Sequence, residues 1–330
     1  MSRDPSTEAD DRALARGVVD ALAAITTVEM RRHAFLRRLS GLEAPEAAAL
    51  LNGVVQLAVD RHRAAAALVP LVGDLRGLAE ALGQARMAAV VDAARRTGRA
   101  DLLRLLTSRT ARRAYDGAPE TGSTSGPASL PLGWRTQLGR TGSRDTLDRL
   151  LYDQQPTVIE NLLRNPRCTE REVVRIAAHR PTSAGVLAVV FRHPKWIQRY
   201  QVKRALALNP YAAPSQSIGL LPSLLTQDLE LIARDETLHH DVASAAAALL
   251  AARGIGAPPP REPAPPPVPP SPDDEAGETP YDEEDGGTIE ASPELKAALE
   301  AALRDIEAVE ALADAAGEAA AKGGPTRSRD

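Results

Sequence analysis

The sequence predicts an all-α protein, in which an N-terminal helical bundle is followed by a short α-solenoid, a Pro-rich acidic linker and a C-terminal amphipathic helix. Three observations support this fold class. Aromatic residues make up only 3% of the chain, whereas Ala, Leu and Arg, which favour helices, are abundant. Apolar residues recur at helical spacing through much of the chain, and one pattern is repeated after 44 residues.

The first segment, residues 1–113, consists of apolar stretches that Gly and Pro residues interrupt. Val18, Leu22 and Ile25 are spaced as on one face of a helix. We therefore expect a small helical bundle here. Residues 114–130 are rich in Gly, Ser, Pro and Thr and have no periodicity, which predicts a flexible linker.

Residues 131–253 contain the internal repeat. The pattern Val-x3-Leu-x2-Asn-Pro occurs from Val158 to Pro166 and again, 44 residues later, from Val202 to Pro210. Helical repeats of this length stack on one another, because one unit cannot bury its apolar face alone. The repeat therefore predicts a solenoid.

Capping residues and prolines mark the helices of this region. Thr169 and Glu172 fit a capping box, and prolines fall between the apolar stretches. We place helices near residues 145–153, 157–164, 169–179, 183–192, 196–208, 214–221, 225–234 and 238–252.

The stretch from Asp148 to Arg253 contains LLRNPRCTEREVVRIAAHRPTS and WIQRYQVKRALALNPYAAP. It resembles bacterial HEAT-like α-solenoid proteins, including a group that shares the signature NP…TEREVVRIA…RPT…RYQVKxAL…NP. The resemblance covers about a third of the chain and implies a stacked-helix scaffold that contacts other proteins. It implies no reaction and carries no catalytic residue over to this chain.

The composition changes after residue 253. Residues 254–291 are Pro-rich and acidic, so we expect them to be disordered. Residues 292–322 predict a helix that Ser292 caps and Gly323 ends, before a tail of residues 323–330. Heptad spacing gives this helix an apolar seam, which binds a partner or docks on the N-terminal bundle. The candidate partner-binding residues of this helix are Leu295, Leu299, Ile306 and Val309 of the seam and Leu303, which flanks it.

Charge is distributed asymmetrically, although the net charge is only −4. Residues 164–204 contain ten basic and two acidic residues, whereas residues 254–291 contain ten acidic residues and one basic residue. The basic stretch is a set of solvated helix faces, a surface for a protein partner, or a nucleic-acid surface with stacking aromatics. We hypothesise that the acidic linker folds back onto it. The candidate partner-binding residues are Arg164, Arg167, Arg171, Arg175, Lys195, Trp196, Arg199, Tyr200, Lys203 and Arg204.

The sequence offers no catalytic, cofactor or metal site. No Gly-rich phosphate-binding motif occurs, and the sequence GSTSG at residues 122–126 has Thr at its centre and lies in a linker. The single cysteine, Cys168, has His179 and His193 nearby in sequence, which is a weak pattern for a nucleophile.

Two further patterns are equally weak. His239, His240 and Asp241 are more typical of a helix start than of a metal site, because adjacent helical residues point in different directions. Some HEAT-like proteins are DNA glycosylases, for which Trp196, Tyr200 and Asp241 are the candidates here, without a motif that joins them.

We therefore expect a non-enzymatic, cytoplasmic adaptor or scaffold that binds a protein partner through the solenoid surface and the C-terminal helix. The alternative is a nucleic-acid-binding solenoid that uses residues 164–204. No apolar run approaches the roughly 20 residues that a membrane-spanning helix needs, and the N-terminus lacks the pattern of a signal peptide.

Overall fold

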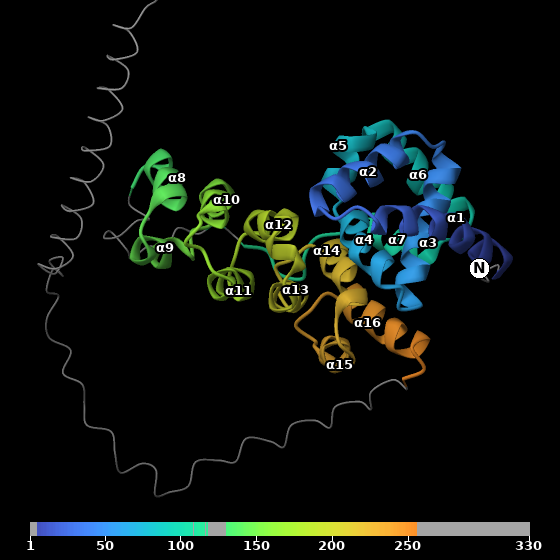
Figure 1. Ribbon diagram of the computed structural model, residues 1–330. Coiled ribbons are helices and arrows are strands. Elements are labelled where there is room, and N and C mark those ends of the chain that lie inside the picture. The colour runs from blue at the N-terminus through green and yellow to red at the C-terminus, as the bar shows by residue number, and fades with distance from the viewer. Residues whose placement is uncertain (1–4, 108, 116, 118–129, 256–330) are drawn as a thin grey trace, which may run out of the picture. The chain divides into compact units, whose positions relative to one another are not determined.

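The computed structural model describes residues 5–107, 109–115, 117 and 130–255, and every regular element within these ranges is a helix (Figure 1). This confirms the all-α class. Most of the linker at residues 114–130 lies outside the described residues. So do the acidic linker beyond residue 255, the seam helix predicted at residues 292–322 and the tail.

The N-terminal helices pack around one central helix, α3. Ala47, Ala48, Leu50 and Leu51 are all buried, and α3 contacts α1, α4, α6 and α7. A helix that is apolar on every side is typically enclosed by others. The seven helices are α1 (Pro5–Ala23), α2 (Val28–Ser40), α3 (Ala44–Val59), α4 (Arg63–Gly73), α5 (Leu75–Leu82), α6 (Gln84–Arg96) and α7 (Ala100–Leu106).

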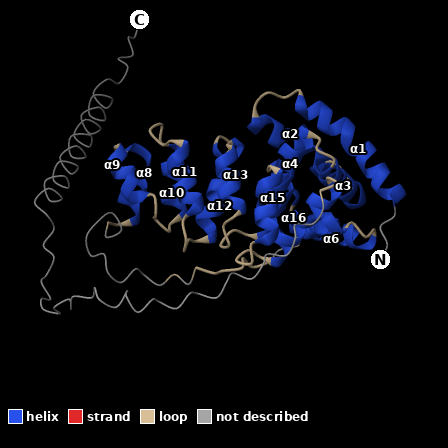
Figure 2. Cartoon of the chain, turned by 90° about the horizontal axis from the view of Figure 1, so that it is seen from below, coloured by secondary structure: helices blue, strands red, loops and turns tan. Residues whose placement is uncertain are grey.

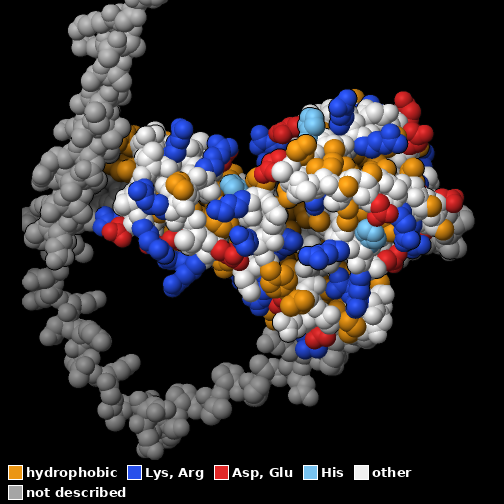
Figure 3. Space-filling view, viewed as in Figure 1, with side chains coloured by type: hydrophobic (Ala, Val, Ile, Leu, Met, Phe, Trp, Pro, Cys, Tyr) orange, Lys and Arg blue, Asp and Glu red, His pale blue; other side chains and the backbone are white. Residues whose placement is uncertain are grey.

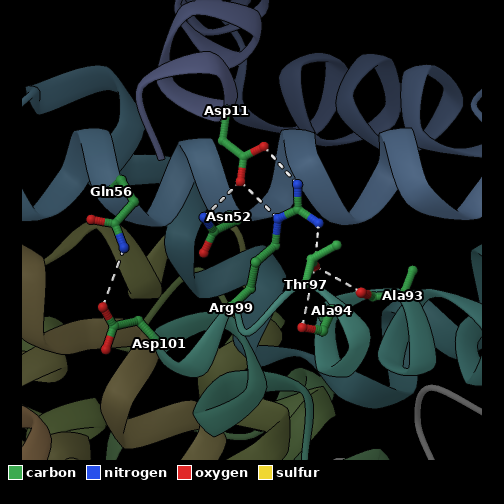
Figure 4. A network of polar contacts seen from close by, with 8 residues as sticks. All are labelled: Asp11, Asn52, Gln56, Ala93, Ala94, Thr97, Arg99 and Asp101. Atoms are coloured by element: carbon green, nitrogen blue, oxygen red, sulfur yellow. Dashed lines mark hydrogen bonds and ion pairs between the residues drawn. The ribbon is translucent and has the colours of Figure 1, made fainter. Parts of the chain in front are cut away.

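A buried polar network joins α1, α3 and the turn before α7 (Figure 4). Asp11 accepts hydrogen bonds from both Arg99 Nε and Nη2 at 2.7 Å, and from Asn52 Nδ2 at 2.8 Å. The Arg99 Nη1 also donates to Thr97 Oγ1. Because the buried Asp11 and Arg99 charges neutralise each other in a bidentate pair, the network fixes three chain segments at a tolerable desolvation cost.

The remaining helices are short, and from α8 to α16 each α-helix begins 12 to 16 residues after the α-helix before it. They are α8 (Leu132–Thr141), α9 (Arg144–Leu150), α10 (Pro156–Arg164), α11 (Glu170–Ala178), α12 (Ala184–Arg192), η2 (Trp196–Gln198), α13 (Tyr200–Ala207), α14 (Pro214–Leu220), η3 (Leu221–Ser223), α15 (Thr226–Arg234) and α16 (His240–Ala252).

The helices from α8 to α13 form two rows, as Figures 1 and 2 show. α10 packs between α8 and α12 in one row, and α11 packs against α13 in the other. Consecutive helices therefore alternate between rows, and each contacts the helix two places along the chain.

The two repeated asparagines make the same contacts. Asn165, after α10, is buried and donates through Nδ2 to the Gly139 carbonyl oxygen of α8 at 3.1 Å. Asn209, after α13, donates to the carbonyl oxygens of Ala177 and His179 at the end of α11, at 2.8 and 3.0 Å. Each asparagine thus satisfies carbonyl groups that the end of a helix leaves without a partner.

A tryptophan and an arginine make the same kind of contact after two other helices. The Trp196 indole Nε1, after α12, donates to the Leu163 carbonyl oxygen of α10 at 3.0 Å. The Arg253 guanidinium, after α16, donates to the carbonyl oxygens of Leu224 and Pro222 at 3.3 and 3.0 Å. In these four cases, a side chain just after one α-helix donates to carbonyl oxygens at the end of the second α-helix before it, or in the turn that follows that earlier helix.

Six of the eight helices predicted in this region lie within two residues of their predicted ends, and a seventh, predicted at residues 145–153, ends three residues early at Leu150. The eighth, predicted at residues 196–208, begins as the short helix η2 and starts again at Tyr200, because Arg199 is extended. The capping box of Thr169 and Glu172 is confirmed, with Glu172 Oε2 2.6 Å from the Thr169 backbone nitrogen. The 44-residue shift carries α10–α12 onto α13–α15, so that one period covers three helices.

The N-terminal helices join the rows at α14. All seven residues of α14 are buried, and it packs against α4, α7, α13 and α16. The approach to α4 depends on Gly73, where a Cβ would lie 2.5 Å from the Ser215 carbonyl oxygen. Gly219 of α14 meets the same stretch of α4, 3.4 Å from the Pro70 Cα if it carried a Cβ.

Candidate functional site

A cleft of about 870 Å³ opens where segments from both ends of the described chain meet. Its lining comes from α2, α4, the end of α12, η2, α13, η3 and the end of α16. We call it the junction cleft. Part of its surface is apolar, with Leu36, Leu71, Phe191 and Ile197 among the lining residues. Its size is within the range typical of ligand pockets.

The charged residues of the junction cleft are unbalanced. Seven cationic side chains but only two carboxylates, Glu29 and Asp74, contribute to its lining. The cations are Arg31, Arg32, Arg61, Arg63, Arg192, Lys203 and Arg253. Because low-dielectric walls strengthen the field of such a group, the cleft favours anionic ligands.

Asp74 organises one wall of the cleft. Its buried carboxylate accepts a hydrogen bond from the Gly77 backbone N–H at 3.2 Å, which caps α5. It also pairs with Arg32 of α2 at 3.2 Å and with Arg192 of α12 at 2.9 Å. One carboxylate therefore neutralises only one of two guanidinium charges, and it connects α2 to α12.

Lys203 supplies a charge that no carboxylate in the described ranges pairs with. It lies on α13, and burial lowers the pKa of its ammonium below the ordinary value. A half-buried ammonium without a counter-ion is costly, and an acidic ligand group beside it removes part of that cost.

Arg253 and Arg61 both line the junction cleft and lie close enough for their charges to interact. Burial, followed by the charge of Arg61, lowers the pKa of Arg253. The buried Arg253 Nε has no hydrogen-bond partner within the described part of the chain. Arg61 and Arg63 are exposed, and neither pairs with a described carboxylate. The Arg61 and Arg63 guanidinium groups are therefore available to an acceptor that enters the cleft, whereas Arg253 already donates to two backbone carbonyl oxygens and contributes its charge.

The basic stretch predicted from the sequence is divided between several environments. Figure 3 shows Lys and Arg side chains scattered among apolar and acidic ones on the face that it displays. Arg164 pairs with Glu160 at 2.6 Å, and Arg175 reaches Asp148 at 3.1 Å and the Tyr152 hydroxyl at 2.9 Å. The other predicted arginines with acceptors in the chain are Arg167 (to the Thr141 and Gly142 carbonyl oxygens), Arg199 (to Glu170) and Arg204 (to Asp228).

The two aromatic side chains predicted for this stretch, Trp196 and Tyr200, make hydrogen bonds that hold the fold together. Trp196 is only 2% exposed, its indole caps α10, and Lys195 Nζ lies 4.0 Å from its ring centroid. The Tyr200 hydroxyl donates to Asp228 and accepts from the Leu225 backbone N–H. Neither ring is free to act as a stacking platform in this conformation.

Of the ten residues predicted for the basic face, Lys203 alone lines the junction cleft, and Arg171 is exposed on α11. Six cleft cations were missed as site residues: Arg31, Arg32, Arg61, Arg63, Arg192 and Arg253. They come from segments more than 100 residues apart, so no local charge pattern indicates that they meet.

The weak chemical patterns have structural explanations where the structure describes them. Burial, followed by the charge of Glu172, raises the pKa of the Cys168 thiol to about 12, so that it stays protonated at neutral pH. His239 caps α16 by accepting from the Asp241 backbone N–H, and Asp241 pairs with Arg109 at 2.9 Å. The GSTSG sequence at residues 122–126 lies outside the described residues.

Within the described ranges, no cluster of three or more His, Cys, Asp or Glu side chains is placed to bind a metal ion. In the same residues, the helices are all too short or too polar to cross a membrane. Comparison with known proteins found no match to this chain among protein-family models, curated proteins or solved structures.

Proposed function

We propose that the chain is a non-enzymatic adaptor or scaffold, and that the junction cleft binds an acidic segment of a protein partner. The observation that carries the proposal is the cleft lining, in which seven cations and two carboxylates surround apolar side chains. Partner helices commonly insert apolar residues into such grooves, while charges at the rim select the partner.

The scaffold in this proposal is a short HEAT-like α-solenoid over residues 131–253. The two rows of helices and the recurring contact between each helix and the one two places along support it. The N-terminal helices then add one wall of the cleft to the scaffold. The seam predicted at residues 292–322 is the second proposed contact with proteins.

The competing function is nucleic-acid binding through residues 164–204. The pairing of Arg164, Arg175 and Arg204 with carboxylates and the burial of Trp196 favour the adaptor. Phosphate binding also gains little from the apolar part of the junction cleft, because the backbone of a nucleic acid is recognised by charge.

The test is capture of partner proteins from a lysate by the full chain, with proteins identified by mass spectrometry. Arg63→Glu reverses an exposed charge in the cleft, and Arg76→Glu reverses an exposed charge on α5 outside it. We expect a protein that wild type and Arg76→Glu retain and Arg63→Glu loses.

Chromatography on heparin and DNA separates the alternatives. The adaptor proposal predicts weak retention at physiological salt, equal in the two charge variants. Strong retention that falls steeply with added salt, together with no protein lost in Arg63→Glu, would overturn the proposal in favour of nucleic acid.

A further inference from the structure

One face of α4 lines the junction cleft along the whole length of the helix. The residues of this face recur at intervals of three and four positions, which places them on one side of a helix. They are Arg63, Ala66, Ala67, Pro70, Leu71 and Asp74. Because a helix rises about 1.5 Å per residue, the face is about 16 Å long from Arg63 to Asp74. The cleft therefore extends along α4 for about three helical turns.

Cations flank both ends of this face. Arg61 and Arg63 lie at the start of α4, are exposed, and pair with no described carboxylate. At the other end of α4, Arg32 and Arg192 share the single carboxylate of Asp74. Each end therefore has an excess of positive charge among the described residues.

Between its ends, the α4 face is apolar. Ala66 and Ala67 have small side chains, and Pro70 follows them about one turn later. Leu36 of α2 and Ile197 of η2 add apolar surface to the lining. Small side chains allow a second helix to pack with its axis about 8–10 Å away. The middle of the cleft can therefore bury apolar side chains, and its two ends can bind acidic ones.

The walls of the cleft restrict how a peptide can bind there. Every regular element in the described ranges is a helix, so the described cleft has no sheet edge to which an extended peptide could add a strand. Proline-rich peptides bind to grooves lined with aromatic side chains, and Phe191 is the one Phe, Tyr or Trp among the described lining residues. The remaining common mode is an amphipathic helix that lies in a groove between helices.

We propose that the junction cleft binds an amphipathic helix of about three turns, which lies along α4 with an acidic side chain at each end and apolar side chains between them. This inference rests on the proposed function, because it specifies the acidic segment that binds in the same cleft. One acidic side chain lies against Arg63, and the other lies against Arg32 or Arg192.

The geometry of α4 sets the sequence pattern of its ligand. A helix that lies along α4 contacts it through residues with the same spacing as the face of α4. The two acidic residues of the ligand are therefore about eleven positions apart, because that number of residues covers about 16 Å. The apolar residues lie three, four, seven and eight positions after the first acidic residue.

An extended acidic peptide is the weaker candidate. It covers the same length with about five residues, and alternate side chains point away from α4. Its backbone N–H and C=O groups also lack a strand to pair with, so covering the apolar lining leaves some of them without partners. A helix satisfies these groups internally.

The first experiment measures binding of designed peptides to the full chain by fluorescence anisotropy at physiological salt. The probe is a labelled peptide rich in Ala and Gln, with two glutamates eleven positions apart and four leucines at the apolar positions between them. Three control peptides have glutamines in place of the glutamates, both glutamates at one end, or a central proline. We expect each control to bind at least about tenfold more weakly than the probe.

These controls separate the parts of the inference. Equal binding of the peptide with both glutamates at one end would overturn the assignment of the two cationic ends. Equal binding of the proline peptide would overturn the helical ligand, because proline breaks the helix. A short single-stranded DNA that displaces the probe as well as unlabelled peptide does would assign the cleft to nucleic acid.

The second experiment reverses the charge at one end of the cleft. Arg63→Glu should weaken binding of the probe at least about tenfold, whereas Arg76→Glu, on α5 outside the cleft, should leave it unchanged. Two further peptides each have lysine in place of one glutamate. At least one of them should bind Arg63→Glu more tightly than wild type, since its lysine then meets a carboxylate. If neither does, the contact at the start of α4 is wrong.

The results also distinguish this inference from the proposed function. If no designed peptide binds, but Arg63→Glu still loses a protein that wild type captures from a lysate, the helical ligand is wrong and the acidic-partner cleft stands. If no peptide binds and Arg63→Glu loses no captured protein, both proposals are wrong.

Discussion

The His193 imidazole is half-buried after the end of α12. Its Nδ1 has no hydrogen-bond partner within the described residues. Burial, and then the charges of Lys195 and Arg164, lowers the pKa of His193 below its ordinary value of 6.5. Burial and these two cations outweigh the carboxylates of Glu160 and Glu29, which favour the protonated ring, so a proton on His193 is unfavourable in the folded chain.

We predict that this ring makes stability depend on pH below neutrality. The unfolded chain takes up the proton near pH 6.5, whereas the folded chain takes it up only at lower pH. The unfolded state therefore binds more protons in that interval, and the free energy of unfolding falls as the pH decreases below about 7. His193→Gln should flatten this slope, measured by urea unfolding between about pH 7.5 and 5.5.

His33→Gln is the control for this experiment, because the His33 side chain is exposed on α2. It should keep the slope of the wild type. A His193→Gln protein whose stability still falls with the wild-type slope would show that other groups cause the pH dependence.

At the scale of the helices, stability depends on caps that cross from one helix to another. The Asn209 amide is buried and is the shared partner of two carbonyl groups at the end of α11. Its own Oδ1 accepts from the Tyr211 backbone N–H at 3.0 Å, which shapes the turn into α14. One side chain thus fixes both the packing of α13 on α11 and the start of the next helix.

We predict that Asn209→Ala costs about 2–3 kcal/mol in the free energy of unfolding, because buried carbonyl groups lose their donor. Asn161→Ala is the matched control. The Asn161 amide bonds within α10, to the exposed Thr157 carbonyl oxygen at 2.9 Å, so its loss should change stability by less than about 0.5 kcal/mol. Equal effects of the two substitutions in denaturant unfolding would contradict this role for Asn209.

The helices after residue 144 were predictable because capping residues and prolines separate them almost regularly. The helix α8 was not placed, since LGWRTQLGRT has few apolar residues and two glycines. The break at Arg199 was also missed, because the burial of Trp196 and its contact with α10 are long-range effects. The repeated asparagines were visible in the sequence, but their partner carbonyl groups were not.

At the scale of the whole molecule, function depends on contacts between distant segments. Asp74 connects α2 with α12, and Gly73 allows α4 to pack on α14. The charge asymmetry of the sequence predicts a basic surface at residues 164–204, whereas most cations of the cleft lie on α2, at the start of α4 and just after α16. A site assembled from such distant segments has no local signature.

We predict that Gly73→Ala destabilises the protein by about 2 kcal/mol or more, because a Cβ meets the backbone of α14. Gly17→Ala should stabilise it by about 0.5–1 kcal/mol, since Gly17 lies in α1 with no atom near its Cβ position. Thermal unfolding followed by circular dichroism measures both.

Tryptophan fluorescence adds a second probe, because Trp134 and Trp196 both belong to the helices after residue 131. The two probes should report one transition in wild type and separate transitions in Gly73→Ala, if α4 and α14 couple the two sets of helices. Coincident transitions in the variant would contradict that coupling.

The capping contact that reaches back two helices has a consequence for how such a chain changes length. Each contact depends only on the order of the helices along the chain. The 44-residue pattern spans three helices, so its two copies lie in different rows, and the asparagine of each copy still makes the capping contact. Gene duplication therefore does not need to copy helices in pairs. A single helix added before α8 would leave every later contact in place, whereas an insertion within α14 would disrupt the core, because all seven residues of α14 are buried.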